Sequence, residues 1–178
     1  MRIHPWHDLP SGPASPDRLN AVIEIPRGSR NKYELDKASG LFMFDRLLYS
    51  AVHYPGDYGF IPRTLAEDDD PLDVVVMVTE PTFSGCLMEV RPIGVFIMRD
   101  EKGLDEKVLA VPVRDPLYDS YTELTHAPPH FLREVEHFFG IYKELEGHET
   151  ELLGWHDRAR AVSIVRDCER RYAETHPA

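Results

Sequence analysis

Residues 67–78 read Glu-Asp-Asp-Asp-Pro-Leu-Asp-Val-Val-Val-Met-Val, an acidic segment that runs directly into an apolar one. The apolar part is rich in β-branched residues and predicts a strand. In a loop that leads into a strand, the carboxylates of Asp68, Asp70 and Asp73 can converge on one cleft, and Pro71 stiffens the turn between them. The segment therefore predicts a strand with a cluster of carboxylates at its start.

This acidic cluster can be interpreted as a metal site or as a solvated loop. Carboxylates this close repel one another unless cations lie among them, yet acidic runs in loops are often only solvated. A Ca²⁺-binding EF-hand loop starting at Asp68 is excluded, because Asp73 stands where that loop needs glycine and Thr79 where it needs glutamate. Carboxylate oxygens without His or Cys favour Mg²⁺ or Mn²⁺ over zinc.

A second acidic pair, Asp100 and Asp105, flanks the segment Glu-Lys-Gly-Leu at 101–104. By itself this pair is typical of a polar hairpin turn. Together with the first cluster, it suggests two carboxylate loops at the ends of neighbouring strands. Such loops can hold two or more ions, as in sites that carry out phosphoryl chemistry.

The rest of the chain predicts a mainly β fold with flanking helices, of the α+β class. The candidate strands are short, rich in β-forming residues and bounded by turn residues. They are 21–25, 32–36, 41–46, 73–78, 89–98 and 107–113. We expect the first three to form a meander with a hairpin loop at 36–40, and 53–62, dense in aromatics, Pro and Gly, to form a rigid loop. This number of short antiparallel strands predicts a small closed barrel.

Two amphipathic helices are predicted after Pro128-Pro129. Apolar residues recur at i, i+4, i+7 and i+11 over 131–142 and again over 157–172. We expect both helices to pack outside the barrel. Because no linker or internal repeat divides the chain, residues 1–178 are expected to form a single domain.

The charge balance restricts the partners. With 31 acidic and 20 basic residues, the formal net charge is -11. This charge repels nucleic acid and anionic lipid surfaces, and an anionic substrate would need metal ions. The N-terminus lacks the apolar core of a signal peptide, and the aliphatic run 74–78 is far too short to span a bilayer. We expect a cytoplasmic protein that binds neither nucleic acid nor membrane.

Basic side chains also stand on the candidate strands. Alternation in Lys32-Tyr33-Glu34 sends Lys32 and Glu34 to one face and Tyr33 to the other, and Arg46 ends the next strand. On an open surface such residues form cross-strand pairs, whereas in a cleft Lys and Arg neutralise phosphate oxygens. Lys143 has two interpretations as well: it complements the dipole of the preceding helix, or it reaches a phosphate.

Over nearly the whole chain, from about Asn20 to Lys143, these residues resemble family I soluble inorganic pyrophosphatases. The central match is Asp68-Asp69-Asp70-Pro71-Leu72-Asp73-Val74, which is similar to the family's D-x-D-P-x-D-hydrophobic motif. The further matches follow in order along the chain: Val22-Ile23-Glu24-Ile25-Pro26, Lys32-Tyr33-Glu34, Asp45-Arg46, Tyr54-Pro55 with Tyr58-Gly59, Arg91-Pro92-Ile93-Gly94, Asp100 with Asp105 and Lys107, and His137-Phe138-Phe139 with Tyr142-Lys143. The opening segment 4–9 resembles the plant-type branch of the family.

The resemblance implies a five-stranded OB-like barrel and the activity of an inorganic diphosphatase. That activity is the Mg²⁺-dependent hydrolysis of pyrophosphate to two orthophosphates by direct attack of a metal-activated water, without a covalent intermediate. Several Mg²⁺ ions would bind per active site, with Mn²⁺ or Zn²⁺ as possible substitutes. The resemblance further implies a homo-oligomer, which would be a hexamer if the source is bacterial.

The resemblance also implies a role for thirteen residues. The metal ligands would be Asp68, Asp73, Asp100, Asp105, Glu34 and Glu24. The pyrophosphate would be bound by Lys32, Arg46, Tyr58, Lys107, Tyr142 and Lys143. Tyr58 would also orient the water, and Asp70 would accept its proton. Asp69 departs from the family pattern, in which Gly, Ser or Asn is more usual at this position.

Two other functions are compatible with parts of this pattern. An OB-like module can bind single-stranded nucleic acid, but it needs a basic groove, and the predicted groove is lined by carboxylates. A different metal-dependent phosphohydrolase, acting on organic phosphates, would suit the metal cluster alone equally well.

Overall fold

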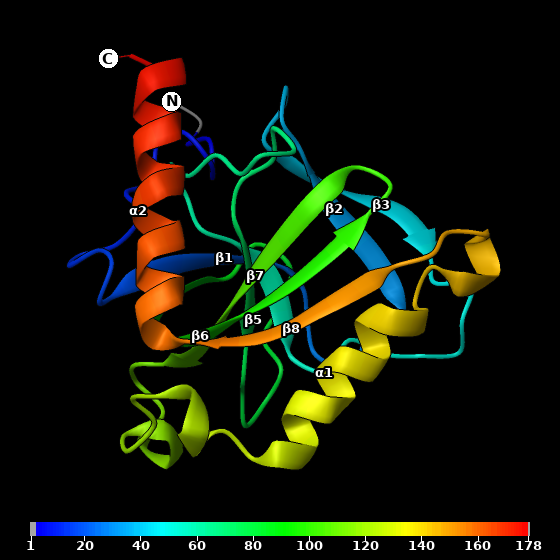
Figure 1. Ribbon diagram of the computed structural model, residues 1–178. Coiled ribbons are helices and arrows are strands. Elements are labelled where there is room, and N and C mark those ends of the chain that lie inside the picture. Colours follow the sequence, from blue (N-terminus) through cyan, green and yellow to red (C-terminus); the bar gives the residue numbers. More distant parts are fainter. Residues whose placement is uncertain (1–2, 178) are drawn as a thin grey trace.

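The computed structural model describes residues 3–177, and its larger sheet closes on itself as a ring (Figure 1). The ring contains, in order, β1 (Leu19–Ile25), β4 (Asp57–Phe60), β5 (Asp73–Val76), β7 (Gly103–Pro112) and β6 (Leu87–Asp100), which pairs back to β1. The predicted five-stranded closure is confirmed as this ring-like sheet. One pairing differs from the expectation, because β5 and β7 run parallel.

The long strand β6 closes the ring and also carries an additional strand. Its first residues pair with β1, whereas its later residues, from Gly94 to Arg99, pair with β8 (Glu151–Asp157). Between these parts the register with β7 shifts between Pro92 and Gly94. A bulge of this kind bends a strand, and proline cannot donate to the ladder. The bend therefore allows one strand to serve two sets of neighbours.

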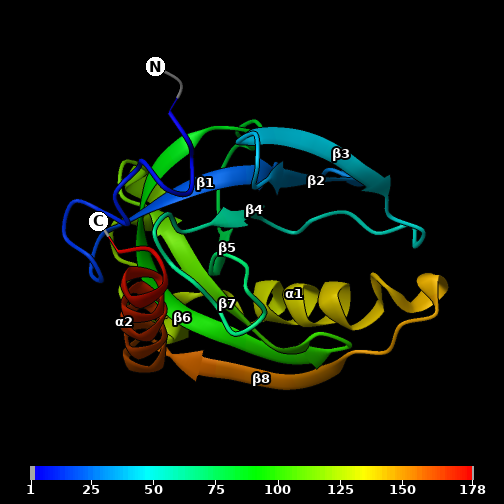
Figure 2. The same ribbon diagram turned by 90° about the horizontal axis from the view of Figure 1, so that it is seen from above.

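The predicted hairpin is confirmed as β2 (Asn31–Asp36) and β3 (Leu41–Leu47), a separate two-stranded sheet that covers one side of the ring (Figure 2). The predicted meander is wrong, because β1 pairs with β4 and β6 and not with β2. Pro26 has no N–H to continue the ladder of β1. Gly28 has a φ of 85° and turns the chain away from the ring.

Two strands were not predicted. β4 has only four residues, one of them glycine, and lies within the segment interpreted as a rigid loop. In β8 the alternation of side chains is interrupted at Gly154, which has a φ of 93° and lies where the register with β6 shifts. Neither segment has the uninterrupted period of two that reveals a strand in sequence.

Both predicted helices are confirmed, as α1 (Pro129–Ile141) and α2 (Arg158–Thr175), and they pack on different sides of the ring (Figure 1). Alternation along the strands explains why each helix has its own core. Val74 and Val76 pack in the cluster that contains apolar residues of α2, whereas Val75 packs in the cluster that contains those of α1. Both sides of β5 are thus buried.

The described residues also form three short 3₁₀ helices, Pro116–Tyr118, Leu124–His126 and Glu144–Glu146. Over residues 3–177, no helix combines the length and apolar character needed to cross a membrane.

The close approach of β1 to β4 predicts a large effect for Gly59→Ala. A Cβ at Gly59 would lie 1.9 Å from the carbonyl oxygen of Val22 and 2.8 Å from the Cα of Ile23. Because both atoms belong to backbone, the ring itself would have to shift. We expect a loss of about 3 kcal/mol in the free energy of unfolding, measured by urea denaturation.

Gly140→Ala is the matched control, since Gly140 lies within α1 and a Cβ there would meet only the side chain of Leu152, at 3.4 Å. Alanine favours helix over glycine by about 1 kcal/mol, so this variant should be slightly more stable than the wild type. Equal stability of the two variants would contradict the packing of β1 on β4.

Candidate active site

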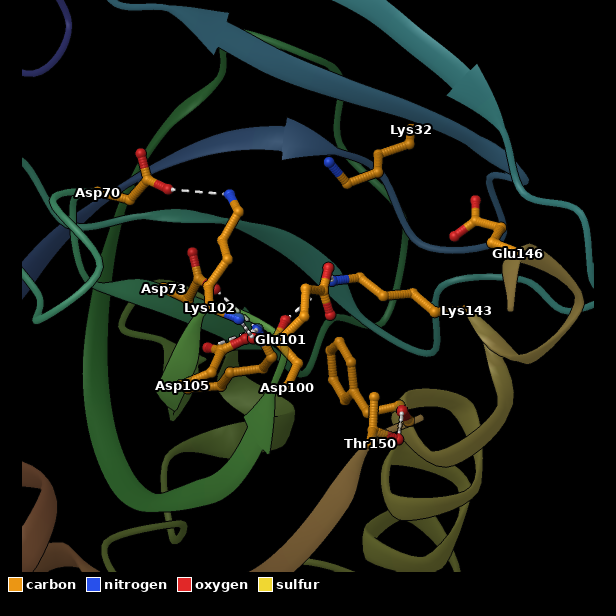
Figure 3. Close-up of polar contacts among 12 residues, drawn as sticks. Lys32, Asp70, Asp73, Asp100, Glu101, Lys102, Asp105, Lys143, Glu146 and Thr150 are labelled. Carbon is orange, nitrogen blue, oxygen red and sulfur yellow. Dashed lines mark hydrogen bonds and ion pairs between the residues drawn. The ribbon is translucent and has the colours of Figure 1, made fainter. Parts of the chain in front are cut away.

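One cavity of about 650 Å³ is lined by every site residue that the sequence predicts. It lies between the β2–β3 hairpin, the acidic loop (residues 67–72), the β6–β7 hairpin and the residues that follow α1, and Figure 3 shows part of its lining. The predicted residues along it are Glu24, Lys32, Glu34, Arg46, Tyr58, Asp68, Asp70, Asp73, Asp100, Asp105, Lys107, Tyr142 and Lys143. The fold thus brings together residues that are up to 119 positions apart, while their individual roles stay predictions.

Lys107 lies at the centre of the site and is 2% exposed. The parallel register of β5 and β7 makes it the direct partner of Asp73, and Asp105 lies two residues earlier on β7. Its Nζ donates to Asp73 Oδ2 at 2.7 Å and to Asp105 Oδ1 at 2.9 Å. Burial disfavours the ammonium, but these two carboxylates outweigh it and hold the pKa of Lys107 well above its usual range.

Tyr58 joins this group from β4. Its hydroxyl donates to Asp73 and accepts from Lys107 Nζ at 2.8 Å. Burial, together with the charges of Asp73 and Asp105, raises the pKa of Tyr58 well above its usual range, so the phenol keeps its proton. The hydroxyl is therefore held as a donor directed at a carboxylate, at the edge of the cavity.

The acidic loop has a backbone conformation that directs two of its carboxylates into the cavity. Asp68 accepts a hydrogen bond from the backbone N–H of Asp70 at 3.1 Å, and the carbonyl of Asp70 accepts from Ala66 at 2.7 Å. Asp69, between them, is exposed and has a φ of 64°. This left-handed conformation is one that Gly adopts freely and that Asn and Asp adopt more readily than most other residues.

The second acidic pair, Asp100 and Asp105, flanks a hairpin turn and also lines the cavity. Asp100 and Gly103 end the β6–β7 ladder, and the side chain of Asp100 accepts from the backbone N–H of Lys102 at 2.9 Å. Asp100 also accepts from Lys143 Nζ at 2.8 Å, which brings the end of α1 to this turn. Burial tends to raise the pKa of Asp100, but the bond from Lys143 and the backbone bond lower it overall.

The strands β1 and β2 supply the remaining carboxylates. Burial raises the pKa of Glu24 to about 8, against a backbone hydrogen bond from Leu35 at 2.8 Å that lowers it. Lys32 forms ion pairs with Glu34 and, at 3.2 Å, with Asp45. Lys32 and Glu34 both face the cavity, as expected.

Tyr33 also lines the cavity, although alternation along a regular strand would place it on the face opposite Lys32 and Glu34. The register between β2 and β3 shifts between Lys32 and Tyr33. A shift of this kind locally breaks the strict alternation on which the prediction relied.

Sequence reasoning assigned no role to five further charged residues that line the cavity, namely Lys37, Asp45, Glu101, Lys102 and Glu146. Glu146 has the most defined contact. It is a half-buried residue of the turn after α1 and accepts two hydrogen bonds from the guanidinium of Arg46, one of them at 2.9 Å from Nη2. The two residues are 100 positions apart, and an isolated Glu in a polar turn carries no signal of such a pair.

The net charge of the cavity lining indicates whether cations can bind there. Ten acidic and six Lys or Arg side chains line it, which is a formal excess of four negative charges. Burial raises the pKa of Asp68, and it also raises that of Asp73 despite the opposing charge of Lys107. These shifts show that burial makes the charged form of both carboxylates costly, a cost that a bound cation would offset.

The donors are carboxylate oxygens, which suit Mg²⁺ and similar ions. Among residues 3–177, however, no three His, Cys, Asp or Glu side chains are arranged to hold one ion. Ammonium groups lie between the carboxylates instead, as Figure 3 shows for Lys143 and Asp100. The residues therefore fit divalent cations in chemistry and charge, provided that these lysines give way.

Comparison with known proteins agrees with this arrangement. Residues 21–173 match the family model described as inorganic pyrophosphatase. The chain is 50% identical over 155 residues to an inorganic pyrophosphatase of Methanosarcina acetivorans, covering 87% of this chain and 92% of the relative. It is 47% identical over 174 residues to soluble inorganic pyrophosphatase 1 of Arabidopsis thaliana, covering 98% and 82%. The crystal structure of inorganic pyrophosphatase from Thermus thermophilus superposes with a TM-score of 0.90 at 46% identity, covering 92% of this chain and 96% of that one. The chain therefore belongs to the inorganic pyrophosphatase family.

Proposed function

We propose that this protein hydrolyses inorganic pyrophosphate to two orthophosphates in a Mg²⁺-dependent reaction, by direct attack of water and without a covalent intermediate. The observation that carries the proposal is the mixed lining of the cavity, with carboxylates for cations and Lys and Arg for phosphate oxygens. A highly charged anion enters a cavity with excess negative charge only together with cations. Family membership supports the choice of pyrophosphate.

Six carboxylates would hold the cations: Asp68, Asp73, Asp100, Asp105, Glu24 and Glu34. When bound, Mg²⁺ neutralises phosphate oxygens and lowers the pKa of a water molecule, so that hydroxide becomes available near neutral pH. Mn²⁺ or Zn²⁺ are possible substitutes. In the structure, Lys107 and Lys143 neutralise part of this set, and they would turn to the substrate when cations take their place.

The phosphates would be bound by cationic and phenolic groups around the cavity, namely Lys32, Arg46, Tyr58, Lys107, Tyr142 and Lys143. Arg46 suits this role because a planar guanidinium can bind an oxyanion through two parallel bonds. In the structure it forms such a pair with Glu146. Charge that develops on the leaving phosphate is stabilised by fixed positive groups, which is the main catalytic effect in phosphoryl transfer.

Asp70 would accept the proton of the attacking water. Its Oδ1 is paired with Lys37, whereas its Oδ2 has only Lys102 at 3.8 Å. Oδ2 is therefore the oxygen that can accept a proton from the cavity. Tyr58, fixed between Asp73 and Lys107, would orient the water and its neighbours. The cytoplasmic location, the single domain and the homo-oligomer, a hexamer if the source is bacterial, stay predictions.

The activity is tested by phosphate release from pyrophosphate with and without Mg²⁺, with ATP as a parallel substrate. We expect release from pyrophosphate only with the metal and far slower release from ATP, because the chain belongs to the inorganic pyrophosphatase family. Full activity in excess chelator would contradict the role of the carboxylates. Faster release from ATP would favour an organic phosphohydrolase, and salt-sensitive binding of single-stranded DNA would favour a nucleic-acid-binding module.

Three asparagine variants test the roles within the acidic loop and at the first residue of β5. Asp70→Asn should lower kcat by about 10²–10⁴-fold while leaving the fold intact, because an amide keeps the shape of the side chain but cannot accept the proton. Asp73→Asn should lower kcat and also raise the Mg²⁺ concentration needed for half-maximal rate. The measurement is a Mg²⁺ titration of the rate, with a thermal melt of each variant.

Asp69→Asn is the control from the same loop. The side chain of Asp69 is exposed, and asparagine tolerates its left-handed backbone. We expect a near-normal rate and metal requirement. Near-normal turnover of Asp70→Asn, or a collapse of Asp69→Asn alone, would show that the proton acceptor has been assigned to the wrong residue.

A further inference from the structure

The N-terminal segment 4–8 is docked on the ring through Trp6. This side chain is 5% exposed and packs in a cluster with apolar residues of β1, β2 and β4. Its Nε1 donates to the carbonyl of Thr64 at 2.9 Å, and its own carbonyl accepts from the backbone N–H of Arg63 at 2.9 Å. Residues 63–64 lie just before the acidic loop. The segment is therefore in contact with the backbone that leads into the site.

The same segment also contacts the turn of the β2–β3 hairpin. His4 Nδ1 accepts from the backbone N–H of Trp6 at 3.3 Å, so Nε2 carries the ring proton and donates to the carbonyl of Lys37 at 2.9 Å. The approach is close, because a Cβ at Gly40 would lie 2.9 Å from the ring of His4 and 3.3 Å from Pro5. Lys37 is thus held at its backbone by the N-terminal segment.

The side chain of Lys37 joins this segment to the acidic loop. Its Nζ lies 5.6 Å from the centre of the Trp6 ring, within the range of a cation–π contact. The same Nζ donates to the carbonyl of Asp69 at 2.9 Å and pairs with Asp70 Oδ1. One ammonium group therefore holds both the left-handed residue of the loop and the carboxylate that follows it.

We propose that Lys37 is a positioning residue for Asp70, and that Trp6 and His4 of the N-terminal segment set the position of Lys37. This inference rests on the proposed function, in which Asp70 accepts the proton of the attacking water. With Oδ1 held by Lys37, the carboxylate presents Oδ2 to the cavity. The N-terminal segment, which lines no part of the cavity itself, thereby acts on the rate of hydrolysis.

Lys102 provides the internal comparison. It also approaches Asp70, at 3.8 Å from Oδ2, but it comes from the β6–β7 hairpin and its side chain is 64% exposed (Figure 3). Lys37 is less exposed, at 46%, and has two contacts with the loop as well as the Trp6 ring beside it. Both lysines carry the same charge near the same carboxylate, but they approach different oxygens, and Lys37 is the one that contacts the N-terminal segment.

The first experiment measures whether Lys37 acts through Asp70. We expect Lys37→Met to lower kcat by about tenfold with little change in the KM for pyrophosphate, because misplacement of a reacting group affects the chemical step. Lys37→Arg should recover most of the rate. In the Asp70→Asn background, Lys37→Met should cause no further loss of kcat. An equal loss in both backgrounds, or an increase in KM with kcat unchanged, would overturn the positioning role.

The second experiment measures the link to the N-terminal segment. Trp6→Leu keeps an apolar side chain but removes the ring, and His4→Ala removes the bond to the Lys37 carbonyl with little effect on the core. Each should lower kcat by about threefold in the wild type and have no further effect in the Lys37→Met variant. In the Lys102→Met variant, both substitutions should lower kcat by the same factor as in the wild type.

These outcomes separate the inference from the proposed function. If Asp70→Asn alone keeps near-normal turnover, the assignment of the proton acceptor fails, whatever Lys37 does. If Asp70→Asn is inactive but the effects of Trp6→Leu and His4→Ala are unchanged by Lys37→Met, the assignment of Asp70 stands and the link through the N-terminal segment is wrong. Thermal melts show whether Trp6→Leu is folded, and His4→Ala tests the same link independently.

Discussion

The site depends on one buried ion cluster, in which the ammonium group of Lys107 bonds to Asp73, Asp105 and Tyr58. These side chains come from three neighbouring strands of the ring, β7, β5 and β4, so the cluster joins the strands at the floor of the cavity. Removing the ammonium group of Lys107 would leave the two carboxylates without their cation, and such a loss from a buried ion pair typically costs about 3–5 kcal/mol. The same contacts fix the positions of side chains that we propose to bind cations and phosphates. One set of side chains therefore both stabilises the fold and forms the site.

The other charged groups of the cavity repeat this pattern. Lys143 pairs with Asp100, Arg46 with Glu146, and Lys37 with Asp70, and each pair joins segments that are distant in sequence. Although these charges are paired, the cavity lining is not neutral, because it contains more acidic than basic side chains. Burial raises the pKa of Glu24 to about 8, because its carboxylate is removed from water, and the neighbouring charges of Asp73 and Glu34 add to the shift. Divalent ions would relieve this imbalance and release Lys and Arg for an anionic ligand.

Much of the fold and of the candidate site could be predicted from the sequence. The sequence predicted strands β5, β6 and β7 from their apolar runs, and helices α1 and α2 from the spacing of their apolar residues. Burial of one face of a strand or helix imposes such a period on the sequence. The acidic motif before Val74 and the residues carried over by family resemblance all line one cavity. Strand β4, with four residues, and strand β8, interrupted at Gly154, lacked a sufficient period and were missed.

The sequence by itself thus determined the strands and helices with regular periods, the acidic loop and the residue types of the site. Only the tertiary structure decided which strands close the ring, why β1 pairs with β4 and β6 rather than with β2, and which charges meet in the cavity. The pair of Arg46 with Glu146 and the contact of Trp6 with Lys37 join segments that no local pattern connects. The physical reason is that periodicity records the burial of one segment at a time, whereas ion pairs and ring closure depend on segments brought together only by the packed core.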